Sequence, residues 1–372
     1  MKRAATTPGY CAKKAAVMYL KARPVTFRSF ASAAFILIII CTSIFSPGCG
    51  PSAGSYVDSG KIYFDKKDYD KAITSFSKAI EIDPGLATAY LGRGRAYYVT
   101  DKSDLAYADY DTAIELYPNS SEAYWGRASC LRRQKEYARA IQDYNKSLQI
   151  DSTNSRSYYG RGYTYYSLEE WDKAIADFSK VIAFNRGLIA GAYSIRSLCF
   201  YQKGDIDQAI ADSEHVLALR QLGSDYNNHG HYLLMKGWFD DAMIYINKGL
   251  ELDPNNAYIW DSRGWCYFKM GNYNQAIDDL SRAIGIVSDS SDIYAHLGAS
   301  YYAVKDYDKA MPYLNKAVEL DGENAEGHYY RGLCYVVSGQ KEKAIADFQA
   351  AINNSTDTPL LKLAMDEIKG LR

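Results

Sequence analysis

The chain has 372 residues, 48% of them hydrophobic, which is enough for two or three ordinary domains or one extended array. Its formal net charge is −1, but residues 1–49 contain seven Lys and Arg and no acidic residue, which leaves 36 basic against 44 acidic side chains in the remainder. This net charge of about −8 beyond residue 49 argues against a nucleic-acid partner, because phosphate binding needs clustered Lys and Arg.

Residues 1–49 have the organisation of an export signal, in which basic residues precede an apolar run, here Phe30 to Phe45, and a small-residue end. The run of 16 residues is short for a membrane span, which needs about 20, although a tilted anchor is an alternative. No basic residue follows the run before Lys61, so the positive-inside rule places the N-terminus in the cytoplasm. We therefore expect a membrane-anchored protein that is extracytoplasmic from about Gly50 onward.

The end of this segment, SPGC, resembles the lipobox of bacterial lipoproteins, in which a cysteine after a small residue is lipidated and becomes the mature N-terminus. The match is to Cys49, and the sequence departs from the pattern at Ser46 and Pro47, where an aliphatic and a small residue are usual. Lipidation of Cys49 and a retained signal anchor are therefore alternatives. Met18 is an alternative start to Met1, because MYLKARPVTFR alone forms an ordinary basic region.

The rest of the chain repeats with a period close to 34 residues. The segment YDKAITSFSKAIEIDP, which begins at Tyr69, recurs for example as EWDKAIADFSKVIAFN from Glu170. Residues 50–358 contain nine such units, which begin near Ala53, Ala87, Ser121, Ser155, Ala190, Gly223, Ala257, Ser291 and Ala325. The apolar residues of each unit follow the periodicity of two amphipathic helices, so the sequence predicts nine helix-turn-helix units.

Each unit combines small residues with bulky rings. The first helix usually has a glycine, such as Gly264, and the second always has an alanine, such as Ala276, where the two helices must approach closely. Aromatic residues recur at the fourth and eleventh places of most units, which accounts for much of the total of 35 tyrosines. We predict that these rings pack in the core.

At these positions the chain resembles the tetratricopeptide repeat family, whose 34-residue pattern has an aromatic residue, Gly, Tyr, Ala, Phe and Pro at set places. The resemblance implies an all-α fold, a right-handed α-solenoid (superhelix) of nine helix-turn-helix units. Unit five departs most, since its register slips by one residue and Ser213 replaces the expected aromatic, so we expect it to be the loosest. Residues 359–372 have an apolar helical face and are predicted to form a C-terminal capping helix.

Arginine and aspartate vary together among the units. Six units have Arg at the seventh place and Asp at place 23, and the pairs are Arg93 and Asp109, Arg127 and Asp143, Arg161 and Asp177, Arg196 and Asp212, Arg263 and Asp279, and Arg331 and Asp347. The other three units lack both residues. Matched variation indicates contact, so we predict an ion pair between the two helices of one unit. An arginine ladder that grips an anionic ligand is the alternative.

Four cysteines occupy the tenth place of their units: Cys130, Cys199, Cys266 and Cys334. Successive members are two units apart, so stacked helix pairs separate them by about 20 Å, too far for a disulfide. Their spacing does not suit zinc either. We therefore predict small buried thiols, and we expect no metal, cofactor or catalytic centre, because no catalytic motif stands apart from the repeat.

A stacked helix-pair solenoid offers a concave surface lined by the first helix of each unit. In the family that the chain resembles, ligands are held by side chains at places 2, 5, 6, 9, 12 and 13 of the unit. The predicted groove residues here are Trp125, Arg132, Tyr159, Tyr163, Tyr166, Asn227, His231, Trp265, Phe268 and Lys269. Aromatic, amide and cationic groups suit peptide recognition, although packing against the next unit is the alternative for each.

The sequence as a whole therefore predicts a membrane-tethered, extracytoplasmic scaffold that binds a protein or peptide partner in its concave groove. We expect it to catalyse no reaction and to bind no nucleic acid. A carbohydrate- or cell-wall-binding accessory protein is the alternative, because a tyrosine-rich groove also suits sugars.

Overall fold

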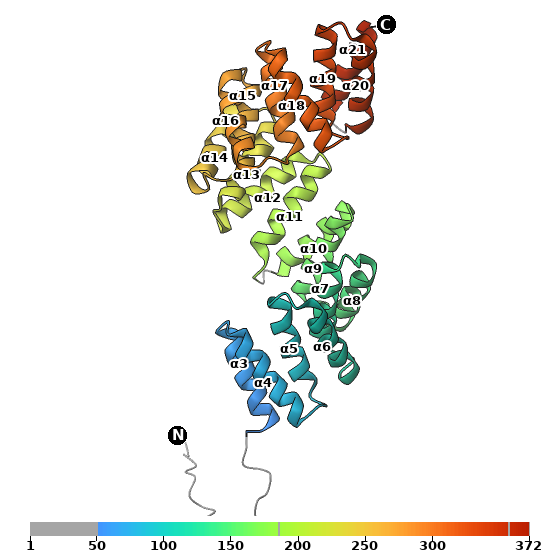
Figure 1. The fold of residues 1–372 in the computed structure, drawn as a ribbon. Coiled ribbons are helices and arrows are strands. Elements are labelled where there is room, and N and C mark those ends of the chain that lie inside the picture. The colour runs from blue at the N-terminus through green and yellow to red at the C-terminus, as the bar shows by residue number, and fades with distance from the viewer. Residues whose placement is uncertain (1–50, 185–186, 356–357, 372) are drawn as a thin grey trace, which may run out of the picture.

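The computed structural model describes residues 51–184, 187–355 and 358–371 (Figure 1). These residues form nineteen α-helices, α3 to α21, and contain no β-strand. The predicted export segment, with Cys49 and both candidate start residues, lies outside the described residues. No helix within the described ranges is long and apolar enough to cross a membrane.

Eighteen of the helices form nine pairs, each joined by a short turn. The pairs are α3 (Ala53–Asp65) with α4 (Tyr69–Ile82), α5 (Ala87–Val99) with α6 (Ser103–Leu116), α7 (Ser121–Arg133) with α8 (Tyr137–Ile150), α9 (Ser155–Ser167) with α10 (Trp171–Phe184), α11 (Ile189–Gln202) with α12 (Ile206–Leu219), α13 (Gly223–Met235) with α14 (Phe239–Leu252), α15 (Ala257–Lys269) with α16 (Tyr273–Ile286), α17 (Ser291–Ala303) with α18 (Tyr307–Leu320) and α19 (Ala325–Val337) with α20 (Lys341–Asn354). The last helix, α21 (Thr358–Leu371), packs its buried Leu360, Ala364 and Ile368 against α20.

The first helix of each pair begins at the predicted start of its unit, except in unit five, where α11 begins at Ile189 rather than Ala190. Leu188 occupies the N-cap position of α11, and its side chain accepts no hydrogen bond from the helix. Asn154 and Asn324 accept such bonds at the starts of α9 and α19. The one-residue slip in unit five therefore coincides with a helix start that lacks a side-chain cap, which leaves its first N–H groups without that partner.

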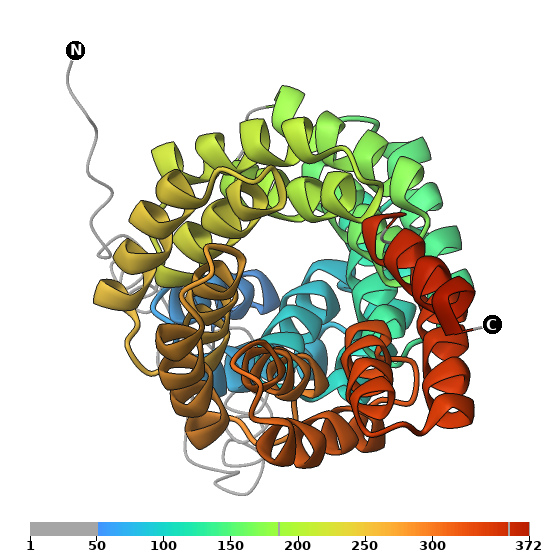
Figure 2. The same ribbon diagram turned by 90° about the horizontal axis from the view of Figure 1, so that it is seen from above.

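The helix pairs stack side by side and wind around a common axis (Figure 1). Seen along this axis, the chain runs round in a right-handed sense, and the C-terminal pairs come to lie above the N-terminal ones (Figure 2). Successive first helices pack against each other along the array, α11 and α13 through side chains such as Tyr201 and His231, whereas successive second helices do so far less. The first helices therefore form the inner, concave layer. The predicted all-α solenoid of paired helices is confirmed.

Small residues lie where the paired helices approach, as predicted. A Cβ atom on Gly264 would come within 2.7 Å of the Leu280 side chain, and one on Gly60 would come within 2.7 Å of the Phe76 ring. Such distances are shorter than any van der Waals contact. The nine repeated alanines of the second helices, Ala276 among them, have no exposed surface. These positions therefore set the distance between the two helices of a unit.

All six predicted Arg–Asp pairs are present as ion pairs between the two helices of a unit. In unit four, Nε and Nη2 of Arg161 donate to the two carboxylate oxygens of Asp177 at 2.8 and 2.7 Å. The other five pairs have the same two-point geometry, with distances of 2.6 to 2.9 Å. Because the aspartates are buried, removing the arginine would leave a buried charge without its main partner.

The third donor of each arginine contacts the preceding unit. Nη1 of Arg263 donates to Oδ1 of Asn247 at 2.9 Å, and Nη1 of Arg93 donates to Oγ of Ser77 at 3.1 Å. These arginines therefore join two units as well as two helices. Units six and eight have His229 and Leu297 at the seventh place, so their junctions with units five and seven lack this arginine.

The repeated aromatic rings pack against the core, as predicted, but they lie at its edge beside these arginines. The guanidinium of Arg161 lies 5.5 and 5.9 Å from the ring centroids of Tyr158 and Tyr165. Both tyrosines are only half-buried, whereas fully buried rings such as Phe76 and Tyr144 belong to the second helices. A guanidinium is attracted to a ring face, and a tyrosine at the edge of the core keeps its hydroxyl near water.

The four cysteines are free and buried, as predicted. Burial raises the pKa of Cys130 and Cys199 to about 12. It raises the pKa of Cys266 and Cys334 to about 11. The thiols therefore stay protonated at neutral pH, which makes them unreactive.

Candidate ligand-binding groove

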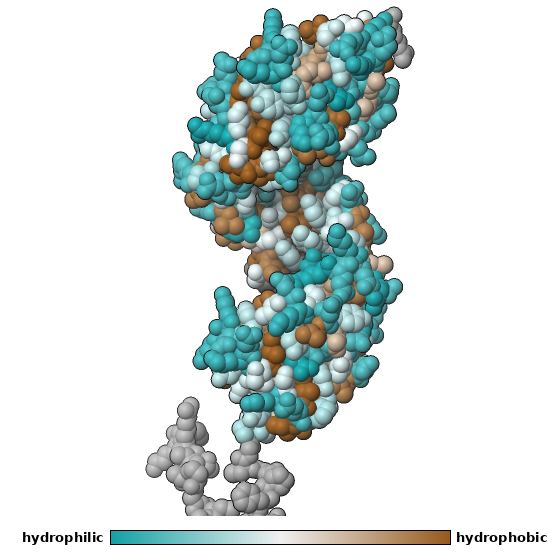
Figure 3. Space-filling view, viewed as in Figure 1, coloured by the Kyte–Doolittle hydropathy of each residue, from teal (hydrophilic) through white to brown (hydrophobic). Residues whose placement is uncertain are grey.

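The ten predicted groove residues lie on four inner helices and form two groups. The N-terminal group, on α7 and α9, consists of Trp125, Arg132, Tyr159, Tyr163 and Tyr166. The C-terminal group, on α13 and α15, consists of Asn227, His231, Trp265, Phe268 and Lys269. Helix α11 separates the two groups. Figure 3 shows hydrophilic side chains over most of one outer face, with hydrophobic patches among them in the upper and lower parts and at the narrow waist.

Aromatic rings and one arginine dominate the N-terminal group. The guanidinium of Arg132 lies 5.0 Å from the ring centroid of Tyr163, which in turn lies 6.0 Å from that of Tyr166. Tyr159 packs edge-on against the buried Phe178 at 5.5 Å. The Nε atom of Arg132 is buried and has no hydrogen-bond partner among the described residues. A buried donor without a partner is costly, so this atom is a candidate contact for a ligand acceptor.

Three charged residues form a clamp beside Trp125, which we call the Glu122 clamp. Glu122 on α7 pairs with Arg95 on α5 at 3.3 Å and with Arg156 on α9 at 3.5 Å. The guanidinium of Arg156 also lies 5.3 Å from the ring centroid of Trp125. One carboxylate between two arginines therefore joins units two, three and four across the concave surface.

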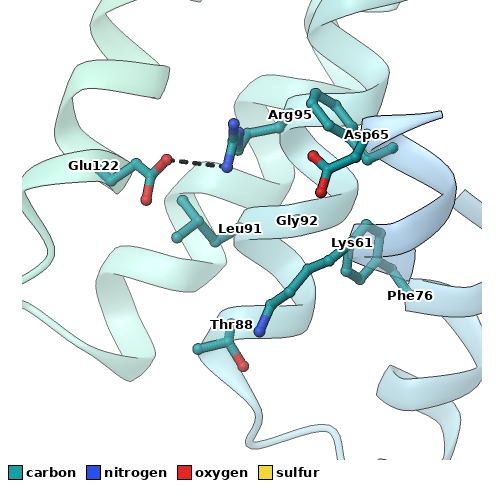
Figure 4. Close-up of a pocket in the computed structure, with 9 residues that line it drawn as sticks. Lys61, Asp65, Phe76, Thr88, Leu91, Gly92, Arg95 and Glu122 are labelled. Atoms are coloured by element: carbon teal, nitrogen blue, oxygen red, sulfur yellow. Dashed lines mark ion pairs between the residues drawn. The ribbon is translucent and has the colours of Figure 1, made fainter. Parts of the chain in front are cut away.

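A pocket of about 390 Å³ lies next to the Glu122 clamp, between α3, α5 and α7 (Figure 4). Leu91 and Phe76 contribute apolar surface to its lining, and Lys61 extends toward Thr88. The Arg95–Glu122 ion pair, marked in Figure 4, closes one side. The pocket combines an apolar floor with charged edges.

The C-terminal group is built around Trp265. Its ring stacks on Phe268 at 4.5 Å and on His296 at 4.0 Å between centroids, and Nζ of Lys269 lies 4.5 Å from its centroid. As a result Trp265 is only 6% exposed. Its ring faces are therefore covered by neighbours, and it can meet a ligand only through its edge.

His296, which the sequence did not single out, lies in a second clamp that we call the His296 clamp. Its Nδ1 lies 2.7 Å from Oδ1 of Asp261, and its Nε2 lies 3.0 Å from Oε2 of Glu326. Burial alone would lower the pKa of His296, but the two carboxylates outweigh that effect and raise it to about 10. The ring is therefore a protonated imidazolium that donates to both carboxylates, and it joins units seven, eight and nine.

A cavity of about 510 Å³, which we call the C-terminal cavity, opens beside the His296 clamp. Its lining comes from α11, α13, α15, α17, α19, α20 and α21 and from the turns that precede α19 and α21: Tyr201, His231, Met235, Asp261, Trp265, Asp292, His296, Asp321, Glu323, Asn324, Ala325, Glu326, Asn354, Ser355 and Leu360. Five of these fifteen residues are acidic. The cavity is therefore strongly negative.

His231 and Asn227 are the polar members of the predicted C-terminal group. Nε2 of His231 lies 3.2 Å from the hydroxyl of Tyr201, and burial lowers the pKa of His231, which keeps the ring neutral at neutral pH. Asn227 is half-buried, and its Oδ1 has no hydrogen-bond partner within the described part of the chain. Of these two residues, only His231 lines the C-terminal cavity.

Four ionisable residues of the C-terminal cavity that lie at ligand-facing places of the repeat were not among the predicted groove residues: Asp261, Asp292, His296 and Glu326. They occupy places 5, 2, 6 and 2 of units seven, eight, eight and nine, which are among the ligand-facing places of the repeat. Reading every unit at those places would have found them. No cluster of three or more His, Cys, Asp or Glu in the described ranges is arranged to hold a metal ion.

Comparison with known proteins identifies the repeat. Family models described as tetratricopeptide repeats match residues 60–100, 91–155, 155–188 and 297–359. A model of subunit 3 of the anaphase-promoting complex, or cyclosome, matches residues 235–317.

Similar curated proteins match only in part. Stress-induced-phosphoprotein 1 of Caenorhabditis elegans is 29% identical over 68 residues, which cover 18% of this chain and 21% of that protein. TPR repeat-containing thioredoxin TTL4 of Arabidopsis thaliana is 32% identical over 57 residues, which cover 15% of this chain and 8% of that protein. The matched segments thus amount to about a fifth or less of the length of these relatives.

Solved structures with the same fold match more of the chain. One chain of the APC/C hetero-tetramer Cut9-Hcn1 has a TM-score of 0.57 at 19% identity, over 81% of this chain and 59% of that one. Human IFIT1 bound to PPP-AAAA has a TM-score of 0.53 at 16% identity, over 86% of this chain and 81% of that one. At such identities the likeness shows the fold alone.

Proposed function

The chain belongs to the tetratricopeptide repeat family, and from this premise we propose that it is a non-catalytic scaffold that binds an extended protein segment along its concave surface. One observation carries the proposal: successive inner helices present aromatic and charged side chains at the same places, beside pockets of about 390 and 510 Å³. Rings supply contact area at low entropic cost, and charged groups bind the polar parts of a peptide.

We propose that the partner segment contacts the groove on both sides of α11. The half-buried rings of Tyr163 and Tyr166 and the unpartnered Nε of Arg132 offer contacts in the N-terminal group. The C-terminal cavity offers carboxylates and the edge of Trp265. An extended segment that crosses α11 would meet both groups, because the inner helices follow one continuous curve (Figure 2).

We propose further that the scaffold is tethered to a membrane on its extracytoplasmic side. Support comes from the sequence of residues 1–49, in which basic residues precede an apolar run and Cys49 follows it. The intact mass of the mature protein distinguishes a lipidated Cys49 from a retained anchor. A mature chain that begins after Cys49, carries no lipid and leaves the membrane in salt would contradict tethering.

The groove is tested by recovering partners from solubilised membranes of the native organism with the full chain. Arg132→Ala removes a cation from the concave surface of unit three, and Lys146→Ala removes one from exposed surface on the outer helix of the same unit. We expect Arg132→Ala to lower partner recovery about tenfold and Lys146→Ala to leave it unchanged. Equal recovery with both variants would contradict groove binding, and retention of glycans with no protein partner would favour a carbohydrate-binding function.

A further inference from the structure

The negative charge of the C-terminal cavity indicates which kind of ligand group it binds. We propose that this cavity receives an arginine or lysine side chain of the bound protein segment, an inference that rests on the proposed scaffold function. The cavity volume of about 510 Å³ accommodates one long side chain with the adjoining backbone.

Three carboxylates of the cavity lack a cation. Asp261 and Glu326 bind His296, but Asp292, Asp321 and Glu323 form no ion pair with any described residue. Asp292 only accepts a hydrogen bond from the Asn324 amide, at 2.8 Å. A cavity wall with this much uncompensated negative charge favours a cationic ligand group, because a nearby positive charge stabilises each unpaired carboxylate.

The titration of Asp292 is consistent with a missing positive charge. Desolvation inside the concave surface, and to a smaller extent the carboxylates of Asp261 and Glu326, raise the pKa of Asp292 above its ordinary value, although His296 opposes them. A bound guanidinium or ammonium group would reverse this shift and favour the ionised carboxylate.

Trp265 supplies a second and independent indication of a ligand. Its side chain is 6% exposed and lines the cavity, yet its indole Nε1–H donates to no residue within the described ranges. The indole N–H of a mostly buried tryptophan usually finds an acceptor. A backbone carbonyl next to a basic residue would supply one, whereas a protonated small amine has no acceptor to offer. Together the two features favour a peptide residue over a small cation.

The test is selection of a random twelve-residue peptide library, displayed on phage, against the full chain. Parallel selections use the double variant Asp292→Asn with Glu323→Gln and a matched control, Asp308→Asn with Glu319→Gln. The control removes the same charge from exposed residues of α18, on the outer layer of unit eight. Both double variants replace acids by amides of equal size, so the fold is expected to persist.

We expect peptides selected by the wild-type chain and the control to share an arginine or lysine. Replacing that residue by glutamine should weaken binding about tenfold, as should the Asp292→Asn, Glu323→Gln pair. Selected peptides that bind without any basic residue would overturn the inference and leave the scaffold function standing. Failure to select any peptide would contradict the scaffold function itself.

A spermidine titration distinguishes a side chain from a small amine. Under the proposal, the selected peptide raises the melting temperature of the full chain, and spermidine at the same concentration does not, because it cannot accept from Trp265. An equal shift with spermidine that disappears in the Asp292→Asn, Glu323→Gln variant would overturn the assignment of the guest as a protein side chain.

Discussion

The N-terminal and C-terminal halves of the groove use the same kind of clamp with opposite charges. In the Glu122 clamp, one carboxylate lies 3.3 and 3.5 Å from Arg95 and Arg156. In the His296 clamp, one imidazolium lies 2.7 and 3.0 Å from Asp261 and Glu326. Each clamp joins three successive units across the concave surface. The clamp that joins three stacked units therefore has a net positive charge in the N-terminal half and a net negative charge in the C-terminal half.

This difference shows that the repeat separates the residues that build the scaffold from those that meet a ligand. The Arg161–Asp177 and Arg263–Asp279 pairs have nearly the same geometry, although they lie in opposite halves. The side chains at the concave places differ in charge and size between the halves. One array can thus present two chemically distinct surfaces to a single extended partner.

The largest effect should come from breaking the shared scaffold, and it should be similar in both halves. Arg161→Ala and Arg263→Ala each leave a buried carboxylate unpaired, so each should cost about 3–5 kcal/mol in the free energy of unfolding by urea. Adding Asp177→Ala to Arg161→Ala should cost less than the sum of the single changes, because the unpaired charge disappears. Strictly additive losses would show that the pair is not coupled.

The next largest effect should be a pH-dependent contribution to the free energy of unfolding that only the C-terminal half makes. His296 has a folded-state pKa of about 10, above an ordinary value of 6.5, so its protonation stabilises the fold fully below about pH 6.5 and this contribution is lost as the pH rises toward 10. His296→Gln should therefore cost about 3 kcal/mol near pH 6 and progressively less toward pH 10. Urea unfolding at several pH values measures this difference.

The matched change in the other half is Glu122→Gln, which removes the central charge of the Glu122 clamp. It removes no histidine, so the pH dependence of stability between 6.5 and 10 should stay as in the unaltered chain. A cost of His296→Gln that is the same at pH 6 and pH 10 would show that the ring is not protonated in the folded state.

A smaller effect should come from the rings beside the arginines. Tyr165→Leu and Tyr267→Leu each remove a ring that lies 5.9 Å from a scaffold arginine, in unit four and unit seven respectively. Each should cost about 0.5–1 kcal/mol, and the two costs should agree because the surroundings repeat. A clear difference between them would mean that the scaffold itself differs between the halves.

The smallest effect should be seen at the cysteines. Cys130 and Cys266 lie in different halves, have no exposed surface and have pKa values raised to about 12 and 11 by burial. In the folded chain neither should react with a thiol reagent at pH 7.5, and both should react after unfolding in urea. Rapid labelling of only one of the two cysteines in the folded chain would reveal local opening in that half.

The scaffold could be predicted from the sequence because each of its parts recurs. The Arg–Asp pairs, the small residues and the buried cysteines occupy the same place in several units, so nine units supply repeated evidence for one contact. The repeated tyrosines were correctly expected to pack in the core, but periodicity does not show how deeply a ring lies. Tyr158 and Tyr165 pack at the edge of the core, where they flank Arg161.

The ligand-facing chemistry was harder to predict because it does not recur. His296 has no counterpart at the same place of another unit, and its partners Asp261 and Glu326 are 35 and 30 residues away in two other units. Trp265 was expected to face a ligand, but the ring of His296, supplied by the next unit, covers one of its faces and leaves only an edge at the cavity. Such contacts follow from the stacking of three units and leave no pattern within one of them.

The central claim, that a partner segment lies on the concave surface, is tested most directly by photo-cross-linking in unit six. Met235, 47% exposed, lines the C-terminal cavity, and Ile244, 65% exposed, lies on the outer helix α14. Benzoylphenylalanine in place of Met235 should cross-link the partner, and the same residue in place of Ile244 should not. Cross-linking at position 244 alone would place the partner on the convex surface and contradict the account.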